Sequence, residues 1–265
     1  MNPEVTDAFP VPWGGDRGTA PGLAFELRES KFHPPGVRPG IVVRTALLGQ
    51  LAATRVPVIT LVAPPGYGKT TLMAQWAQRT ESRVAWLSCD DTDNDPVVLL
   101  SALAVALSRI GPVDPAIFSA LASSGADITV VPRFVAAVAP VQPPVTVLVD
   151  HAEAVTNRQC LNTIAEFALR LPPGWQFALA SRTVVPLPTA RLRAHGGILE
   201  ITADDLAMGV TEAHSLLKGA GVEGRRGQPS RSPAADRRMA SRALYRRTRH
   251  QVRHPPERRR FHVHR

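Results

Sequence analysis

One stretch of the sequence combines the residue types that hold a phosphate group. A β-branched apolar run that begins at Val58 stops at two prolines, and a turn bracketed by glycines leads to Lys69, Thr70 and Thr71. The helical pattern Leu72–Gln78 follows. A phosphate-binding loop needs this order of buried strand, tight loop and helix N-terminus. Small residues let backbone N–H groups turn toward phosphate oxygens, and the helix dipole adds a favourable potential.

The roles of the single side chains follow from that pattern. Lys69 is predicted to reach the β- and γ-phosphates of a nucleotide, and the hydroxyl of Thr70 to bind Mg²⁺. The usual pattern G-x-x-x-x-G-K-[ST] has a glycine where this chain has Ala63, but alanine is excluded only from positive φ. A chance Gly-Lys-Thr-Thr in an ordinary turn is the alternative. The predicted nucleotide-binding residues are Ala63, Pro64, Pro65, Gly66, Tyr67, Gly68, Lys69, Thr70 and Thr71.

A second candidate group ends the short, almost wholly apolar run Val145–Asp150. Continuous β-branched runs indicate strands buried on both faces of a parallel sheet. An aspartate at the carboxyl end of such a strand holds the nucleotide's Mg²⁺ in phosphate-loop proteins, so Asp150 is predicted as a metal ligand beside Thr70. A turn or capping role is the alternative.

The next position bears on hydrolysis, which usually needs a second acid there to activate water. This chain has His151, with Glu153 two residues further on. A histidine can accept a proton near neutral pH. His151 is therefore predicted as a catalytic residue with Asp150, and Glu153 is the alternative if the turn brings it to the site. The sequence supports nucleotide binding better than hydrolysis.

Arg182 stands just beyond another predicted strand, Gln176–Ser181. In open α/β sheets, ligands bind in the crevice outside the carboxyl ends of the strands. A guanidinium group there pairs well with phosphate oxygens, so Arg182 is predicted as a third catalytic residue that senses the γ-phosphate. A surface arginine at a strand end is the alternative.

These patterns together predict an α/β fold of the P-loop NTPase kind, with three α/β/α layers and a mainly parallel five-stranded sheet. The strands are expected from Val58 and at Arg83–Ser88, Val145–Asp150, Gln176–Ser181 and Ile198–Ile201. Helices are expected at Thr45–Thr54, Leu72–Gln78, Pro96–Ile110, Asn162–Leu171 and Thr211–Lys218, with two or three short helical pieces between Gly111 and Pro144.

The acidic run Cys89–Pro96 has two interpretations, a calcium loop or a loop in which Asp95 caps a helix that begins at Pro96. It lacks the glycine and the distal glutamate of an EF-hand, which favours the cap. The two cysteines, Cys89 and Cys160, have no metal-ligand spacing and indicate free thiols in a reducing cytosol. With no secretory signal and no apolar run long enough to span a bilayer, a cytoplasmic protein is expected.

The net charge of +9 is concentrated at one end of the chain. Residues 224–265 contain fourteen arginines and two acids, a balance of +12, so the other residues sum to −3. One interpretation is a basic arm that binds nucleic-acid phosphates non-specifically. The favoured hypothesis is a frameshift in a GC-rich gene, whose out-of-frame codons yield Arg, Pro, Ala and Gly.

With these residues in view, the chain resembles the N-terminal NTPase module of the large ATP-binding LuxR-type transcriptional regulators, which include the maltose-regulon activator and belong to the STAND class. The resemblance covers about residues 31–220. The matching segments are Lys31–Arg44, Ala63–Thr71 (loops of this family typically begin with Ala), Ala85–Ser88, Asp93–Pro96, the strand ending at Asp150, Ala180–Thr183, Pro186–Pro188, Ala190–Arg193 and Ala203–Leu206.

The resemblance implies a function and a set of partners. In that family ATP and an inducer switch the protein to an oligomerising state, and a C-terminal helix-turn-helix binds DNA. It implies ATP and Mg²⁺ as cofactors, Lys69 and Thr70 at the phosphates and metal, Asp150 as the Walker B acid, Arg182 as the sensor arginine, and self-association through the NTPase domain. His151 departs from the usual Asp-Asp pair, which indicates weak or absent hydrolysis.

The expected organisation is a flexible segment 1–30, an NTPase domain 31–222 and an Arg-rich disordered tail 223–265. The expected function is an ATP-binding switch module of a truncated regulator that lacks its DNA-reading domain and contacts DNA only indirectly or through the tail. A stand-alone P-loop ATPase, or a nucleic-acid-binding protein acting through the tail, is the alternative.

Overall fold

A computed structural model describes residues 27–37, 40–124, 130–187, 189–210 and 212–214 of the 265 in the chain. The contacts divide the chain into two units, Met1–Leu206 and Ala207–Arg265, of which the first holds the sheet. In the second, a helical turn is described, in which the Ala213 N–H donates to the Gly209 carbonyl at 2.9 Å. The predictions for most of segment 1–30, for most of the helix Thr211–Lys218 and for the tail 223–265 lie outside the described residues.

Five strands form one sheet in the order β2-β3-β4-β1-β5, and every neighbouring pair is parallel. This confirms the predicted α/β fold with a parallel five-stranded sheet. The strands are β1 (Val58–Val62), β2 (Arg83–Ser88), β3 (Val145–Asp150), β4 (Trp175–Ser181) and β5 (Ile198–Thr202).

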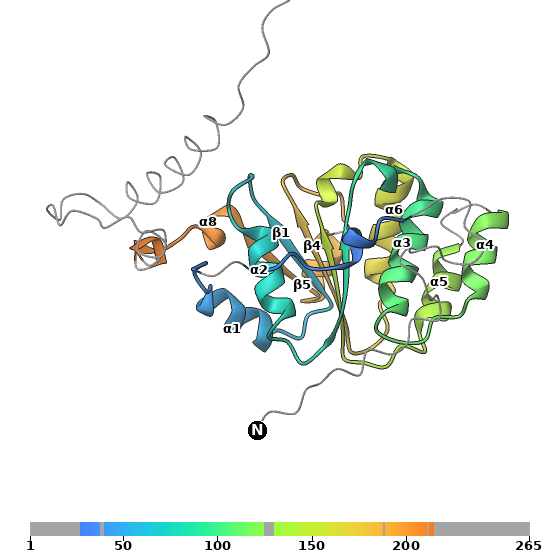
Figure 1. Ribbon diagram of the computed structural model, residues 1–265, viewed down its shortest axis with the longest axis horizontal. Coiled ribbons are helices and arrows are strands. Elements are labelled where there is room, and N and C mark those ends of the chain that lie inside the picture. The colour runs from blue at the N-terminus through green and yellow to red at the C-terminus, as the bar shows by residue number, and fades with distance from the viewer. Residues whose placement is uncertain (1–26, 38–39, 125–129, 188, 211, 215–265) are drawn as a thin grey trace, which may run out of the picture. The chain divides into compact units, whose positions relative to one another are not determined.

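Helices cover both faces of this sheet, which makes three layers. Figure 1 shows α1 and α2 on one side of the sheet and α3 to α6 on the other. The helices are α1 (Thr45–Ala53), α2 (Lys69–Ala77), α3 (Pro96–Ser108), α4 (Ala116–Ser124), α5 (Val131–Val138), α6 (Arg158–Leu169), α7 (Thr189–Ala194) and α8 (Ala203–Leu206). None of the helices in the described part of the chain has the length and apolar character to cross a membrane.

The strands divide their side chains between two hydrophobic cores, because successive residues of a strand point to opposite faces. On β4, Phe177 and Leu179 belong to the core under α3 to α6, whereas Ala178 and Ala180 belong to the core under α1 and α2. The core under α1 and α2 also contains the buried Trp86.

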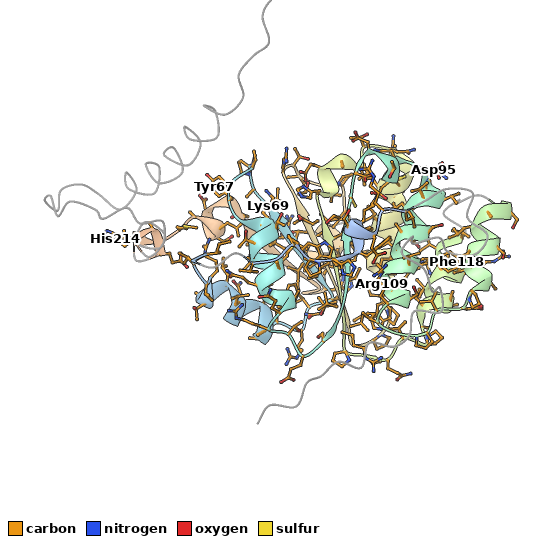
Figure 2. All side chains as sticks on the ribbon, viewed as in Figure 1. Tyr67, Lys69, Asp95, Arg109, Phe118 and His214 are labelled. Atoms are coloured by element: carbon orange, nitrogen blue, oxygen red, sulfur yellow. The ribbon has the colours of Figure 1, made fainter. Side chains whose placement is uncertain are left out.

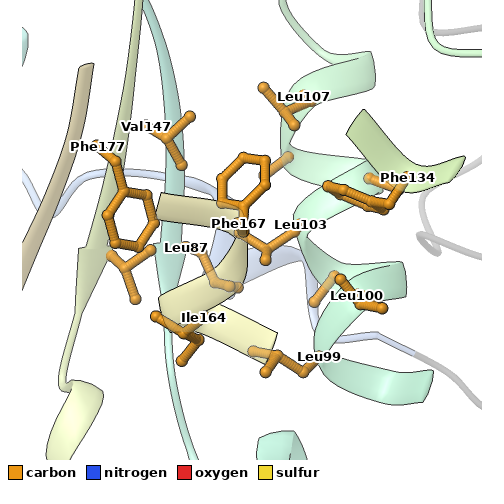
Figure 3. Close-up of a cluster of buried hydrophobic side chains, with 14 of the residues drawn as sticks. Leu87, Leu99, Leu100, Leu103, Leu107, Phe134, Val147, Ile164, Phe167 and Phe177 are labelled. Carbon is orange, nitrogen blue, oxygen red and sulfur yellow. The ribbon is translucent and has the colours of Figure 1, made fainter. Parts of the chain in front are cut away.

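Aromatic rings connect α5, α6 and the sheet through the larger core (Figure 3). The rings of Phe134 and Phe167 meet edge to face at 5.6 Å between centroids, and those of Phe167 and Phe177 at 5.7 Å. Such T-shaped pairs add about 0.5–1.5 kcal/mol each beyond the area they bury. They fix α6 on β4, the strand that leads to Arg182.

The acidic run before α3 ends in the predicted helix cap. The side chain of Asp95 accepts hydrogen bonds from the N–H groups of Val97 and Val98, and Pro96 occupies the first helical turn. The capping interpretation of this residue is therefore confirmed. Asp93 is used differently, because its carboxylate is fully buried and accepts from the ammonium group of Lys31 at 2.7 Å.

Both cysteines are free and buried, as predicted for thiols with no partner. Burial raises the pKa of the Cys89 thiol well above its usual value and that of Cys160 to about 11. Both side chains therefore stay protonated at neutral pH and serve as small apolar groups in the larger core.

The Lys31–Asp93 ion pair gives the first testable prediction. Burial raises the pKa of Asp93, while Lys31 opposes that shift. We expect Lys31→Met to lower the free energy of unfolding by about 3–5 kcal/mol at neutral pH, because it leaves a buried carboxylate without its cation. Urea denaturation monitored by circular dichroism measures this loss.

The matched control is the double variant Lys31→Met/Asp93→Asn. It also removes the buried, unpaired carboxylate and should therefore recover most of the lost free energy of unfolding. A raised pKa means that the folded state takes up a proton before the unfolded chain does. The cost of Lys31→Met is therefore present at neutral pH and is relieved as the pH falls through the raised pKa of Asp93. Equal losses in the single and double variants at every pH would contradict this account.

Candidate functional site

The candidate site lies at the edge of the sheet where the parallel strands end. The strand order places β4 between β1 and β3, and Ser181 at the end of β4 pairs with Val62 at the end of β1. Arg182, the next residue, therefore stands between the loop that follows β1 and Asp150 at the end of β3. The topology gathers residues from three separated parts of the chain at one edge.

The predicted phosphate loop is a turn that runs directly into a helix. Gly66 and Gly68 have φ angles of +88° and +79°, which L side chains rarely adopt, and Gly68 is the N-cap of α2. The helix begins at Lys69, earlier than the expected Leu72, so Thr70 and Thr71 lie in its first turn. The first N–H groups of a helix have no carbonyl partner within it, which leaves them free to bind an anion. In Figure 2, Tyr67 and Lys69 lie at this end of α2.

Ala63 occupies the position of the missing glycine without strain. Among the described non-glycine residues only His151 has a positive φ, so the backbone at Ala63 needs no glycine. Its N–H donates to the Ser181 carbonyl at 3.3 Å, and its methyl group is buried in the core under α1 and α2. The predicted tolerance of alanine here agrees with the local conformation.

Lys69 is folded back onto its own loop. Its ammonium group donates to the carbonyl of Ala63 at 2.6 Å and to that of Pro64 at 3.1 Å, and the side chain is buried. Burial lowers the pKa of Lys69, while the carboxylates of Glu153 and Asp150 act in the opposite direction. The ammonium group thus faces two acids and two carbonyl oxygens at the positive end of a helix.

Asp150 presents an unused oxygen at the same edge. The residue is 2% exposed, and its Oδ2 atom is buried without a hydrogen-bond partner among the described residues. The Nε2 atom of His151 lies 3.5 Å from this oxygen. A buried carboxylate oxygen is the kind of ligand that Mg²⁺ takes in proteins, so the donor at this position fits the implied metal.

His151 holds the chain in a sharp turn after β3. Its φ of 57° and ψ of 33° lie in the left-handed region, and the residue caps the short 3₁₀ helix η4 (Ala152–Ala154). Its Nε2 atom lies 3.5 Å from Asp150 and its Nδ1 atom 3.7 Å from Glu153. The turn directs Glu153 toward the site.

The structure adds Glu153 to the predicted group through its pairing with Arg182. One oxygen of Glu153 lies 2.8 Å from the Nε atom of Arg182, and the other accepts from the Arg182 backbone N–H at 3.0 Å. In the sequence, the feature that pointed to Glu153 was the place of its carboxylate three residues after Asp150. Its partner could not be identified because Arg182 is 29 residues away in the chain.

The structure thus brings together four predicted residues, Lys69, Asp150, His151 and Arg182, at one edge of the sheet. Thr70 lies half-buried in the first turn of α2, and Pro64, Pro65, Gly66 and Gly68 form the exposed part of the loop. The assignment of ATP and Mg²⁺ to these residues stays a prediction. The donors present, which are loop N–H groups, a lysine, a hydroxyl, a carboxylate and an arginine, fit a magnesium nucleotide.

Comparison with known proteins gives relatives of one kind. No protein-family profile matches the chain. The HTH-type transcriptional regulator MalT of Serratia proteamaculans is 32% identical over 195 residues, which make up 72% of this chain and 22% of that protein. MalT of Yersinia enterocolitica is 29% identical over 196 residues with the same shares, and MalT of Vibrio cholerae 29% identical over 193 residues, 69% of this chain and 21% of that protein.

Among solved structures, the Walker-type ATPase PABY2304 of Pyrococcus abyssi aligns with a TM-score of 0.44 and 11% identity, covering 80% of this chain and 65% of that one. This chain spans about a fifth of the length of the curated MalT proteins that it matches. The sequence comparisons confirm the resemblance to the ATP-binding LuxR-type regulators, because over 72% of its length the chain is homologous to the transcriptional regulator MalT.

Proposed function

We propose that this chain is the ATP-binding switch module of a LuxR-type transcriptional regulator. The observation that carries the proposal is the buried ammonium group of Lys69, which is held on two loop carbonyls at the N-terminus of α2. An ammonium group in this position is ready to exchange its carbonyl partners for phosphate oxygens. The homology to MalT supports the assignment to a regulator.

In this proposal the residues of the site divide the phosphates, the metal and the charge of Lys69 among them. Lys69 and the first-turn N–H groups of α2 bind the β- and γ-phosphates, while Arg182 faces the γ-phosphate. Thr70 and Asp150 hold Mg²⁺, which offsets the phosphate charge when bound. The two carboxylates that face Lys69 keep the ammonium group charged against the effect of burial.

The site favours binding over hydrolysis. A hydrolytic site needs a carboxylate that is free to activate water, and the carboxylate of Glu153 is already engaged by Arg182 at 2.8 Å. His151 replaces the usual second acid and lies beside Asp150. A stand-alone ATPase is therefore the weaker candidate, and slow or absent turnover is expected of the module.

The output of such a module is a change of state rather than a product. The relatives are named as HTH-type regulators, so DNA binding is a property of those proteins. We propose that nucleotide binding here controls self-association of the module and that any contact with DNA is indirect. The arginine-rich segment after Val222 plays no part in this proposal.

The direct test compares nucleotide affinity in the wild type and in Lys69→Ala. Loss of the ammonium group removes charge-assisted bonds to the phosphates, so the dissociation constant for Mg-ATP should rise at least about tenfold. Isothermal titration calorimetry measures both constants. The matched control is Arg55→Ala, which removes a cation that donates to the carbonyls of Ala52 and Thr54 near α1. Equal affinity in the wild type and Lys69→Ala would refute the proposed site.

The metal role of Asp150 predicts an effect that depends on Mg²⁺. In Asp150→Asn the amide keeps the shape of the side chain but loses the anionic oxygen, so ATP affinity in excess Mg²⁺ should fall about tenfold. With EDTA in place of Mg²⁺, the wild type and the variant should bind ATP with similar affinity. A loss of the same size in both conditions would mean that Asp150 acts without the metal.

The conformation at Ala63 predicts that restoring the usual glycine brings no benefit. Ala63→Gly should lower the free energy of unfolding by about 1 kcal/mol, because glycine has more backbone freedom to lose and the buried methyl group is removed. Gly68→Ala should also destabilise, by about 1–2 kcal/mol, because of its positive φ. Thermal denaturation ranks the variants. A more stable Ala63→Gly would show that alanine is strained in this loop.

A further inference from the structure

Glu153 contacts Arg182 in two independent ways. One oxygen pairs with the Nε atom at 2.8 Å, and the other accepts from the backbone N–H at 3.0 Å. The backbone hydrogen bond fixes the chain where it leaves β4, and the ion pair holds the guanidinium group beside Glu153. One carboxylate thus restrains both the backbone and the side chain of Arg182.

The contact leaves one edge of the guanidinium group open. Only the Nε atom of Arg182 is used by Glu153, and no described residue pairs with either Nη atom. The side chain is 52% exposed, so its two Nη groups can reach a ligand. A planar fork with two free parallel donors matches the geometry of phosphate oxygens.

Glu153 is itself held in place from another part of the fold. It lies in η4, which a single side chain, that of Asn94, joins to the loop before α3. The Asn94 amide donates to the Ala154 carbonyl at 2.8 Å, while its oxygen accepts from the N–H groups of Thr156 at 2.7 Å and Asn157 at 2.8 Å. The segment that carries the carboxylate is therefore fixed at the last residue of its short helix and just beyond it.

The charge of Glu153 also acts on the phosphate loop. Among the charged groups, Glu153 has the largest effect on the pKa of Lys69 and raises it, and Asp150 follows in the same direction. The charge of Arg182 lowers that pKa. Glu153 thus lies near enough to both cations to influence the same bound anion. A carboxylate that only balanced charge would not need to accept a directed hydrogen bond from the Arg182 backbone N–H as well.

We propose that Glu153 is the positioning residue for Arg182 and that, by directing the two Nη groups toward the γ-phosphate position, it sets the preference of the site for nucleoside triphosphates over diphosphates. This inference rests on the proposed nucleotide site. It differs from the general claim of nucleotide binding because it concerns the last phosphate alone. Binding of a diphosphate depends on Lys69 and the loop, and does not need Arg182.

The test measures dissociation constants for Mg-ATP and Mg-ADP by calorimetry in the wild type and in Arg182→Ala, Glu153→Ala and Glu153→Gln. In Arg182→Ala the ratio of ADP to ATP constants should fall about tenfold, with ADP affinity changed by less than about twofold. Glu153→Ala should lower the ratio by a similar factor. The double variant should match Arg182→Ala, because the two residues act through one contact.

Glu153→Gln separates positioning from simple charge. The glutamine oxygen can still accept the hydrogen bond from the Arg182 backbone N–H, so this variant should keep more of the ATP preference than Glu153→Ala. Equal losses in both would mean that only the charge matters and would overturn the positioning role. Glu166→Ala is the matched control, because Glu166 pairs with Arg170 on α6. It should leave the ratio unchanged.

The outcomes distinguish this inference from the proposed function. If Lys69→Ala leaves ATP affinity unchanged, the nucleotide site itself is wrong. If Lys69→Ala abolishes binding while Glu153→Ala keeps the wild-type ratio of ADP to ATP dissociation constants, only the role of Glu153 is overturned. The same role is overturned if the wild type binds ADP as tightly as ATP. Melting curves verify that each variant folds. If Glu153→Ala does not fold, Glu153→Gln is compared with the wild type in its place, because glutamine keeps the shape of the side chain.

Discussion

A buried positive charge at the positive end of a helix is the constraint on which the candidate site depends. The ammonium group of Lys69 sits at the first residue of α2, where the helix dipole disfavours a cation, and burial disfavours it further. Two loop carbonyls and two nearby carboxylates offset this cost. The helix dipole that disfavours a cation at this N-terminus favours an anion. A bound phosphate group would therefore offset the cost of holding the ammonium group of Lys69 there.

The sheet order explains how the compensating charges reach that lysine. Because β4 lies between β1 and β3, the turn after β4 stands between the phosphate loop and Asp150, and a carboxylate after β3 can reach across to an arginine after β4. The run Asp93–Asp95 then ties neighbouring parts of the fold to one another. Its three residues pair with Lys31, fix the loop after β3 and cap α3. Each of the three side chains has a separate structural task.

Local patterns in the sequence were enough to predict much of the fold. The strands Arg83–Ser88 and Val145–Asp150 were predicted with their observed bounds, because a continuous apolar run marks a strand buried on both faces. The start of α6 was predicted too late. That helix begins at Arg158 behind an Asn157 cap, and its first turn is polar, so apolar periodicity did not reveal it.

The candidate site was predictable where its chemistry is local and not where it depends on tertiary contacts. The phosphate loop is a continuous pattern, and a carboxylate or an arginine at a strand end can be recognised in one segment. The Glu153–Arg182 pair joins residues 29 apart, and the Lys31–Asp93 pair joins residues 62 apart. Neither pair leaves a pattern within a single element, so both required the folded chain.

A crystal structure of this protein with Mg²⁺ and a non-hydrolysable ATP analogue would test the candidate site most directly. We expect the ammonium group of Lys69 to leave the carbonyls of Ala63 and Pro64 and to donate to phosphate oxygens, with Asp150 at the metal. A nucleotide bound elsewhere, with Lys69 still on both carbonyls, would contradict this expectation.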